Sequence, residues 1–281
     1  MKQIFFADER QNDLARKGYA VVPLLARDEA AQLILEIDEL LRGYDFTAES
    51  QFYFYPNHIS FLSSDAAYKR RVAELVERVV APRLNRFLAD YRAWGQSFYI
   101  KPPGGPEIAL HNDWTFAPNL QIYALNLWCP LVDVDETNGA LQVVAGSHKL
   151  WPNINGPGVT PYFGEFAATS KKLARPVPLR AGEALIFENS ILHGSTPNNS
   201  TITRYAITSL CLPKEVRPAL YYPVNAANGP VFEVYEVDNE VFITHSSADF
   251  LSGNIRAPRL RTIPNHNQTI TEQEFLRRLA S

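Results

Sequence analysis

Apolar residues in the first third of the chain recur mainly at helical spacing. Residues 18–22 form a short apolar run that predicts a strand, and a helical pattern follows from about residue 30 to residue 41. Asp28 and Glu29 suit the first turn of this helix, because the amino end of a helix carries partial positive charge. Gly43 is expected to end it.

A second helix is predicted to begin at Ser64 or Asp65. Either side chain can cap the first free backbone amides, and valines and leucines then recur on one face. Pro82 is expected to bend this helix or divide it in two, since proline lacks an amide hydrogen and crowds the preceding turn. Residues 51–62, between the two helices, are rich in aromatic side chains and are interpreted as a packed loop.

From residue 94 onward the apolar runs become short and are separated by turns. The predicted strands span residues 95–101, 120–131, 140–145, 183–188 and 201–212. Many short strands with such turns indicate a mainly β fold with flanking helices, here a jelly roll. Residues 151–176 have little regular pattern and are interpreted as a lid or a surface excursion.

The last part of the chain gives weaker signals. Residues 231–237 and 240–245 are predicted to form a hairpin. Thr271 and Glu274 have the spacing of a capping box, which predicts a short final helix.

The chain shows no internal repeat and no low-complexity linker, so we expect a single domain over residues 1–281. Within it we distinguish a helical part at 1–93, a jelly-roll core at 94–212 and a C-terminal extension at 213–281.

Composition excludes several classes of partner. The net charge is −3 and no basic block occurs, so nucleic acid is not an expected partner. No apolar run approaches the ~20 residues that cross a bilayer, and the N-terminus is too charged for a signal peptide, so no membrane association is expected. Cys129 and Cys211 are too few for a disulfide framework; we expect buried thiols and a cytoplasmic location. The oligomeric state is left open.

The candidate chemistry begins at His111 and Asp113. Two residues apart in an extended segment, their side chains point to the same side and can bind one metal. Such a pair alone is more often a hydrogen-bonded surface pair. His193, 82 residues downstream at the end of an apolar run, supplies a second imidazole. Two imidazoles and one carboxylate form the facial triad of non-haem iron(II) oxygenases, which leaves three positions for a chelating co-substrate and O₂.

Arg204 follows His193 by eleven residues, across a turn and onto a new strand. A guanidinium there can bind a carboxylate through two parallel hydrogen bonds, as the distal carboxylate of 2-oxoglutarate requires. Ser195 can add a hydroxyl to the same carboxylate.

At this point the sequence resembles the phytanoyl-CoA dioxygenase family. The stretches that carry the resemblance are FYIKPPGG (98–105), HND (111–113), NGALQVVAGSHK (138–149), AGEALIFENSILHGS (181–195) and Arg204. His-x-Asp alone is unspecific, whereas this ordered set is specific. The resemblance covers residues 95–212 well, the N-terminal part loosely and residues 213–281 hardly at all.

The resemblance implies a double-stranded β-helix, the jelly-roll core of the cupins, with iron(II) bound by His111, Asp113 and His193. It also implies a set of residues that contact 2-oxoglutarate: Arg204, Ser195, Trp128, Tyr99 and Ser97.

Some family members contribute a lysine to this co-substrate from the N-terminal region. No counterpart is evident here; Tyr53, Tyr55 and His58 lie near the place where it would fall.

The activity implied by the resemblance is oxidation of an unactivated C–H bond of a small molecule, with O₂ and 2-oxoglutarate consumed and succinate and CO₂ formed. Related halogenases have a small residue in place of the metal carboxylate. Asp113 therefore argues for hydroxylation and against halogenation.

Three alternatives stay open. The same cofactor chemistry can be diverted to desaturation, cyclisation or epimerisation. A jelly-roll protein can bind a metal without turnover, and a cupin-type enzyme can use another metal without 2-oxoglutarate. Arg204 disfavours the last two, because neither needs a co-substrate clamp.

The substrate itself is beyond the sequence. No cluster of basic residues in 50–62 or 151–170 suggests a site for coenzyme A phosphates, and the aromatic stretch 52–61 favours a compact, partly apolar or cationic ligand. Trp114 and Phe116 either face the substrate or fill the core. A tailoring role in natural-product biosynthesis is our working hypothesis.

Overall fold

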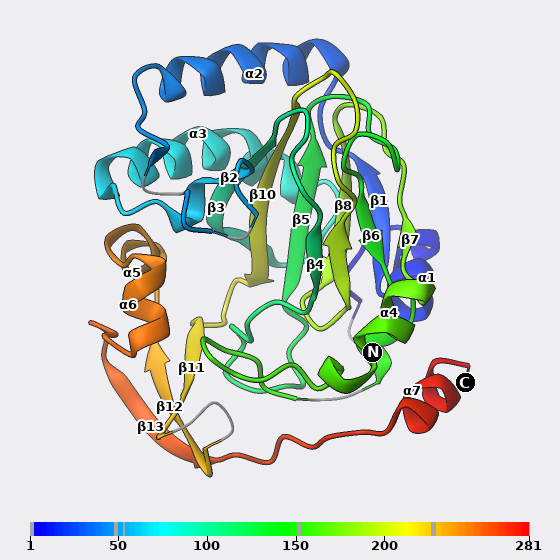
Figure 1. The fold of residues 1–281 in the computed structure, drawn as a ribbon, viewed down its shortest axis with the longest axis vertical. Coiled ribbons are helices and arrows are strands. Elements are labelled where there is room, and N and C mark those ends of the chain that lie inside the picture. Colours follow the sequence, from blue (N-terminus) through cyan, green and yellow to red (C-terminus); the bar gives the residue numbers. More distant parts are fainter. Residues whose placement is uncertain (1–2, 48–49, 53, 151–152, 226–228, 281) are drawn as a thin grey trace.

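Two antiparallel sheets form the centre of the molecule (Figure 1). The computed structural model describes residues 3–47, 50–52, 54–150, 153–225 and 229–280. The larger sheet has the order β1 (Tyr19–Pro23), β8 (Glu183–Glu188), β5 (Leu125–Pro130), β10 (Arg204–Pro213), β3 (Tyr91–Lys101), β2 (His58–Ile59). The smaller sheet has the order β4 (Ile108–His111), β9 (His193–Ser195), β6 (Leu141–Val143), β7 (Arg175–Pro176). This arrangement confirms the predicted jelly-roll core.

The central strands β5 and β8 of the larger sheet are buried on both faces, which explains their nearly continuous apolar runs. In β8, Ala184 and Ile186 belong to the core beneath the N-terminal helices. Leu185 and Phe187 alternate with them and pack inward, against residues of the smaller sheet such as Leu141. Leu141 and Phe187 of this inward layer also line a cavity between the sheets, which is described below.

Three helices belong to the N-terminal part: α1 (Asp8–Lys17), α2 (Arg27–Leu41) and α3 (Ala66–Leu84). The sequence pattern did not predict α1. Asp65 caps α3, as expected, by accepting a hydrogen bond from Tyr68 N at 3.0 Å. The expected division at Pro82 does not occur, and α3 continues to Leu84. Pro82 lies in the last turn, where little of the helical hydrogen-bond ladder remains to be broken.

The short helical elements of the loops are η2 (Ser60–Leu62), η3 (Ser147–Lys149), η4 (Gly164–Phe166) and α4 (Ala167–Leu173). The segment interpreted as a lid or surface excursion contains η4 and α4. Its Phe163 and Phe166 are buried and pack with Phe275 near the C-terminus. This part of the segment is therefore packed onto the fold.

The C-terminal part forms a separate sheet of β11 (Ala219–Pro223), β12 (Val231–Glu236) and β13 (Arg259–Pro264), with helices α5 (Asn239–Thr244), α6 (Ser247–Ser252) and α7 (Glu272–Leu279). The predicted hairpin is wrong in its second half. Residues 239–244 are helical, because the Asp238 side chain caps the turn by accepting from Val241 N at 3.0 Å. The final helix is confirmed, with Thr271 accepting from Glu274 N at 3.2 Å.

Cys129 and Cys211 are buried and unpaired, as expected for small apolar residues. Burial raises the pKa of both thiols. Within the described part of the chain, every helix is too short or too polar to span a membrane.

Candidate active site

His111 and His193 lie directly opposite each other where β4 pairs with β9. Their ring centroids are 4.3 Å apart. Asp113 follows β4, with one carboxylate oxygen 3.8 Å from His111 Nε2 and the other 3.6 Å from His193 Nε2. One donor atom from each of the three side chains falls within 4.8 Å of the others. The three residues singled out in the sequence therefore converge on one point.

Backbone contacts fix the orientation of both imidazoles. Nδ1 of His111 lies 2.8 Å from the carbonyl oxygen of Ala109, and Nδ1 of His193 lies 3.1 Å from that of Ile191. A carbonyl oxygen only accepts hydrogen bonds, so Nδ1 carries the proton in each ring and Nε2 keeps its lone pair. The Nε2 atoms of both histidines, which carry these lone pairs, face the carboxylate of Asp113. This donor set fits a divalent metal such as iron(II).

The surroundings keep His193 neutral and hold Asp113 in place. Burial lowers the pKa of His193 to about 4, although Asp113 acts in the opposite direction. Asn126 of β5 donates a hydrogen bond to Asp113 Oδ2, and Asp113 N donates to the Asn189 carbonyl at 3.0 Å. Such contacts around a ligand set its geometry.

Arg204 lies at the start of β10, buried with 3% of its surface exposed. Its guanidinium carbon is 5.3 Å from the centroid of the Trp128 ring. Its Nε has no hydrogen-bond partner among the described residues. Burial lowers the pKa of Arg204 to about 10, so the group still keeps its charge at neutral pH. A buried guanidinium with an unpaired donor fits an anionic ligand such as the distal carboxylate of 2-oxoglutarate.

Lys101, at the end of β3, is fully buried beside this arginine. Its Nζ donates to Ser195 Oγ at 2.8 Å, to the Thr196 carbonyl at 2.6 Å and to the Pro106 carbonyl at 2.9 Å. Because Ser195 Oγ accepts from Lys101, its own hydroxyl proton is free to donate to a ligand.

A cavity of about 370 Å³ contains the metal-side residues. The described residues that line it include all eight site residues expected from the sequence: Ser97, Tyr99, His111, Asp113, Trp128, His193, Ser195 and Arg204. Burial raises the pKa of Tyr99, whose charged neighbours are Asp113 and Arg204. The Ser97 hydroxyl is already paired with Ser60 Oγ at 2.7 Å. Trp114 and Phe116 line the same cavity, so both face the site.

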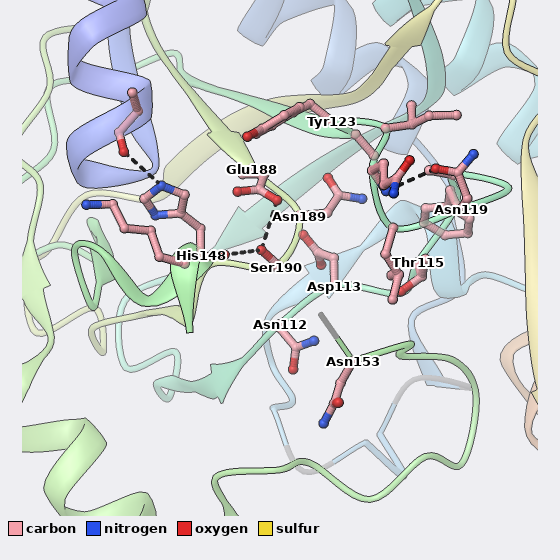
Figure 2. A pocket seen from close by; sticks show the side chains of 18 residues that line it. Asn112, Asp113, Thr115, Asn119, Tyr123, His148, Asn153, Glu188, Asn189 and Ser190 are labelled. Carbon is pink, nitrogen blue, oxygen red and sulfur yellow. Dashed lines mark hydrogen bonds between the residues drawn. The ribbon is translucent and has the colours of Figure 1, made fainter. Parts of the chain in front are cut away.

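A second cavity, of about 500 Å³, adjoins the first; Asn112, Asp113 and Phe116 line both. Figure 2 shows it, with Glu188, Asn189 and Ser190 in the middle and His148 to one side. His148 therefore lines a cavity, but not the one that holds the triad. Arg204 and Ser195 line the smaller cavity and are absent from the described lining of the larger one.

The N-terminal candidates for the co-substrate differ in environment. Tyr53 lies outside the described residues. Tyr55 is exposed. His58 is buried in the core, with Nε2 2.6 Å from the Tyr68 hydroxyl.

The sequence reasoning missed Lys101 and Asn126. Each is a polar residue inside or at the end of an apolar strand, FYIK or LNLWCP. A buried polar side chain in such a run needs a partner, and this was the signal that could have singled them out.

Comparison with known proteins gives the family. A model of the family "Phytanoyl-CoA dioxygenase (PhyH)" matches residues 14–206. The chain belongs to this family. The match ends inside β10 and leaves out the C-terminal part.

Two curated proteins show how similar this chain is in sequence to its relatives. Phytanoyl-CoA dioxygenase 1 of Oryza sativa subsp. japonica is 31% identical over 118 residues, which are 40% of this chain and 42% of the rice protein. A probable alpha-ketoglutarate-dependent hypophosphite dioxygenase of Stutzerimonas stutzeri is 26% identical over 220 residues, 70% of this chain and 75% of that protein. The chain thus matches less than half of the rice relative.

Among solved structures, the epimerase SnoN in complex with Fe³⁺, alpha ketoglutarate and nogalamycin RO has a similar fold. The TM-score is 0.56 at 22% identity, covering 75% of this chain and 85% of SnoN.

Proposed function

We propose that this protein is an iron(II)- and 2-oxoglutarate-dependent dioxygenase that hydroxylates an unactivated C–H bond of a small molecule. One observation carries the proposal. The donor atoms of His111, Asp113 and His193 converge in the same cavity as the buried guanidinium of Arg204, whose Nε has no hydrogen-bond partner among the described residues. A protein that only bound a metal would not need a buried carboxylate clamp beside it.

The three convergent side chains would hold the metal, and the chemistry it supplies is the activation of O₂ at the expense of 2-oxoglutarate. The protein's own contribution is geometric. Backbone carbonyls keep Nε2 of each histidine unprotonated, and Asn126 orients the carboxylate of Asp113.

Arg204 would bind the distal carboxylate of the co-substrate, and Ser195 would donate its hydroxyl proton to the same group. Lys101 would hold Ser195 in that orientation, while burial, with Arg204 nearby, lowers the pKa of the Lys101 amine to about 7. The Trp128 ring packs against the guanidinium of Arg204. These contacts would fix the co-substrate before any substrate arrives.

Hydroxylation is the outcome that Asp113 favours, since a halogenase of this type lacks the carboxylate. Epimerisation is the second candidate, because the structurally similar SnoN is an epimerase. Desaturation and cyclisation belong to the same group of diverted outcomes. The hypothesis of natural-product tailoring rests on that likeness as well.

The test is succinate formation. Protein loaded with iron(II) without air is mixed with 2-oxoglutarate and then exposed to O₂, since many such sites turn over slowly without substrate. We expect succinate and CO₂ from the native protein and none from Asp113→Ala. Succinate formation that is unchanged in Asp113→Ala would overturn the proposal.

We also propose a single domain and a cytoplasmic location. Supporting the first, Lys69 of α3 donates to the carbonyl oxygens of Phe242 and His245, 2.8 and 2.6 Å away in the C-terminal part. Supporting the second, Cys129 and Cys211 are unpaired thiols.

A further inference from the structure

The C-terminal part of the chain reaches the metal-side cavity through α5. Phe242 of this helix lines the cavity, although it lies beyond the residues that match the family. In Figure 1, α5 lies below α3 and beside the edge of the larger sheet at β3. A segment that the family match leaves out therefore forms part of the wall.

Three contacts fix α5 against the rest of the fold. Buried Lys69 of α3 donates to the carbonyl groups of Phe242, in α5, and of His245, the residue that follows the helix. Gly95 N of β3 donates to the Asn239 side chain at 2.9 Å. Arg70 and Glu240 form a two-pronged ion pair with both distances 2.7 Å. The position of the Phe242 ring is thus set by partners on two other elements.

Phe242 joins aromatic side chains from two distant segments of the chain. Its ring centroid is 5.3 Å from that of Phe61 and 5.4 Å from that of Phe116. Phe61 is in turn 6.3 Å from Trp114. All four line the cavity, and we call them the aromatic wall. Phe116 packs edge to face with Phe242, as Trp114 does with Phe61, while the rings of Phe61 and Phe242 are tilted by 34°. Together the four rings present an apolar surface to the cavity.

Few of the described residues that line this cavity can carry a charge. Among its described lining residues, the only ionisable groups of acidic, basic or histidine type are His111, Asp113, His193 and Arg204. Each of these already has a role toward metal or co-substrate. A charge on the substrate would therefore lose its hydration without gaining a counter-ion, and stacking on aromatic faces recovers only part of that loss for a cation.

We propose that the aromatic wall binds the substrate, that Phe242 is a specificity-determining residue supplied by the C-terminal segment, and that the substrate is a small uncharged molecule with an apolar ring or branched hydrocarbon group. The proposal rests on the function proposed above, and it names the substrate class of that same site. The cavity of about 370 Å³ must also hold the co-substrate, so little of its volume is left for the substrate.

A matched set of probes tests the charge preference without turnover. Cyclohexanol, cyclohexanecarboxylate and cyclohexylammonium share one ring and differ in charge. Their binding to the full chain, loaded with Mn²⁺ and 2-oxoglutarate, is measured by saturation-transfer NMR. We expect cyclohexanol to bind at least about tenfold more tightly than either ion, in the range that one pocket contact supplies. Equal or tighter binding of either ion would overturn the proposal.

The Mn²⁺ ion reports where the probe lies, because its unpaired electrons speed the relaxation of nearby protons. Enhanced relaxation of the cyclohexanol ring is expected for the native protein. A protein that binds no Mn²⁺ would contradict the proposed function. Saturation transfer would still show whether the aromatic wall prefers the uncharged probe. If the protein holds Mn²⁺ and cyclohexanol binds without enhanced relaxation, the probe lies away from the metal. That result would overturn the proposal that the aromatic wall binds the substrate.

Phe242→Ala is expected to weaken the binding of cyclohexanol by about tenfold and to leave the affinity for 2-oxoglutarate unchanged. Phe232→Ala is the control, since Phe232 is equally buried in the C-terminal part but belongs to the core around β12. If Phe242→Ala does not fold, Phe242→Leu keeps most of the volume and removes the ring. Unchanged cyclohexanol binding in a folded Phe242 variant would remove this residue from the wall.

Discussion

Nζ of Lys101 lies 2.8 Å from Oγ of Ser195 and donates a hydrogen bond to it. The same Nζ also donates to the backbone carbonyls of Thr196 and Pro106. Every donor of this buried lysine is therefore used, and the serine hydroxyl is turned so that its proton faces away from the lysine. Ser195 and Lys101 act as a unit next to Arg204.

Lys101→Met is expected to weaken 2-oxoglutarate binding by about tenfold, because the amine that orients the Ser195 hydroxyl toward the charged ligand is lost. Ser195→Ala should have a similar effect. The double variant should be little worse than either single variant, since residues in one network do not act additively. Anaerobic calorimetry on Mn²⁺-loaded protein measures this. Full additivity would show that Lys101 acts independently of the serine.

His111→Ala, Asp113→Ala and His193→Ala are each expected to abolish tight metal binding while the fold is kept. Each substitution removes one of three donors from the triad. Metal content after anaerobic reconstitution with iron(II), alongside circular dichroism, gives the result. His58→Ala is a control histidine outside the triad. Iron retained in all three variants would disprove the site.

Arg204→Gln is expected to weaken the binding of 2-oxoglutarate by about 2–5 kcal/mol, because a buried carboxylate loses its charged partner. Metal affinity should be unchanged. The binding of 2-oxobutyrate, which lacks the distal carboxylate, should be unaffected by the same change. Comparing the two acids by calorimetry identifies the clamp. An equal loss for both would indicate that Arg204 acts on the metal end instead.

Glu188→Gln is expected to stabilise the metal-free protein more at pH 8 than at pH 5. Burial raises the pKa of Glu188 to about 7 from an ordinary 4.5, against the hydrogen bond from Ser190. Between these two values the folded chain holds a proton that the unfolded chain releases, so the stability of the native protein falls as pH rises through this window. Glutamine never ionises and can still accept from Ser190. Urea unfolding at pH 5–8 measures the difference, with the exposed Glu165→Gln as control; a pH-independent difference would contradict the prediction.

Turnover under ¹⁸O₂ with excess chloride is expected to give a product that contains ¹⁸O and no chlorine. Asp113 provides the carboxylate that chlorinating relatives lack. Mass spectrometry of the product, once a substrate of the proposed class is identified, decides the outcome. Chlorinated product would refute the argument from Asp113, whereas oxidised product without ¹⁸O would indicate desaturation, cyclisation or epimerisation.

Local patterns were enough to predict helices α2, α3 and α7 and the long strands of the larger sheet. The strand at β8 and the caps at Asp65 and Thr271 follow from a few neighbouring residues, because side-chain spacing and capping act within one or two turns. The same local information failed at residues 239–244. An apolar run there is equally compatible with a strand, and only the Asp238 cap favours the helix.

The sequence by itself determined the donor set and its order along the chain, since His111, Asp113, His193 and Arg204 have chemistry that few other residues can replace. Tertiary structure alone decided how these groups are supported. Lys101 and Ser195 are 94 positions apart, and Lys69 and Phe242 are 173 apart, yet each pair is in contact. Such contacts depend on how the sheets and helices pack. Contacts between residues so far apart produce no periodic pattern in the sequence, so the partner of a given residue cannot be predicted from it.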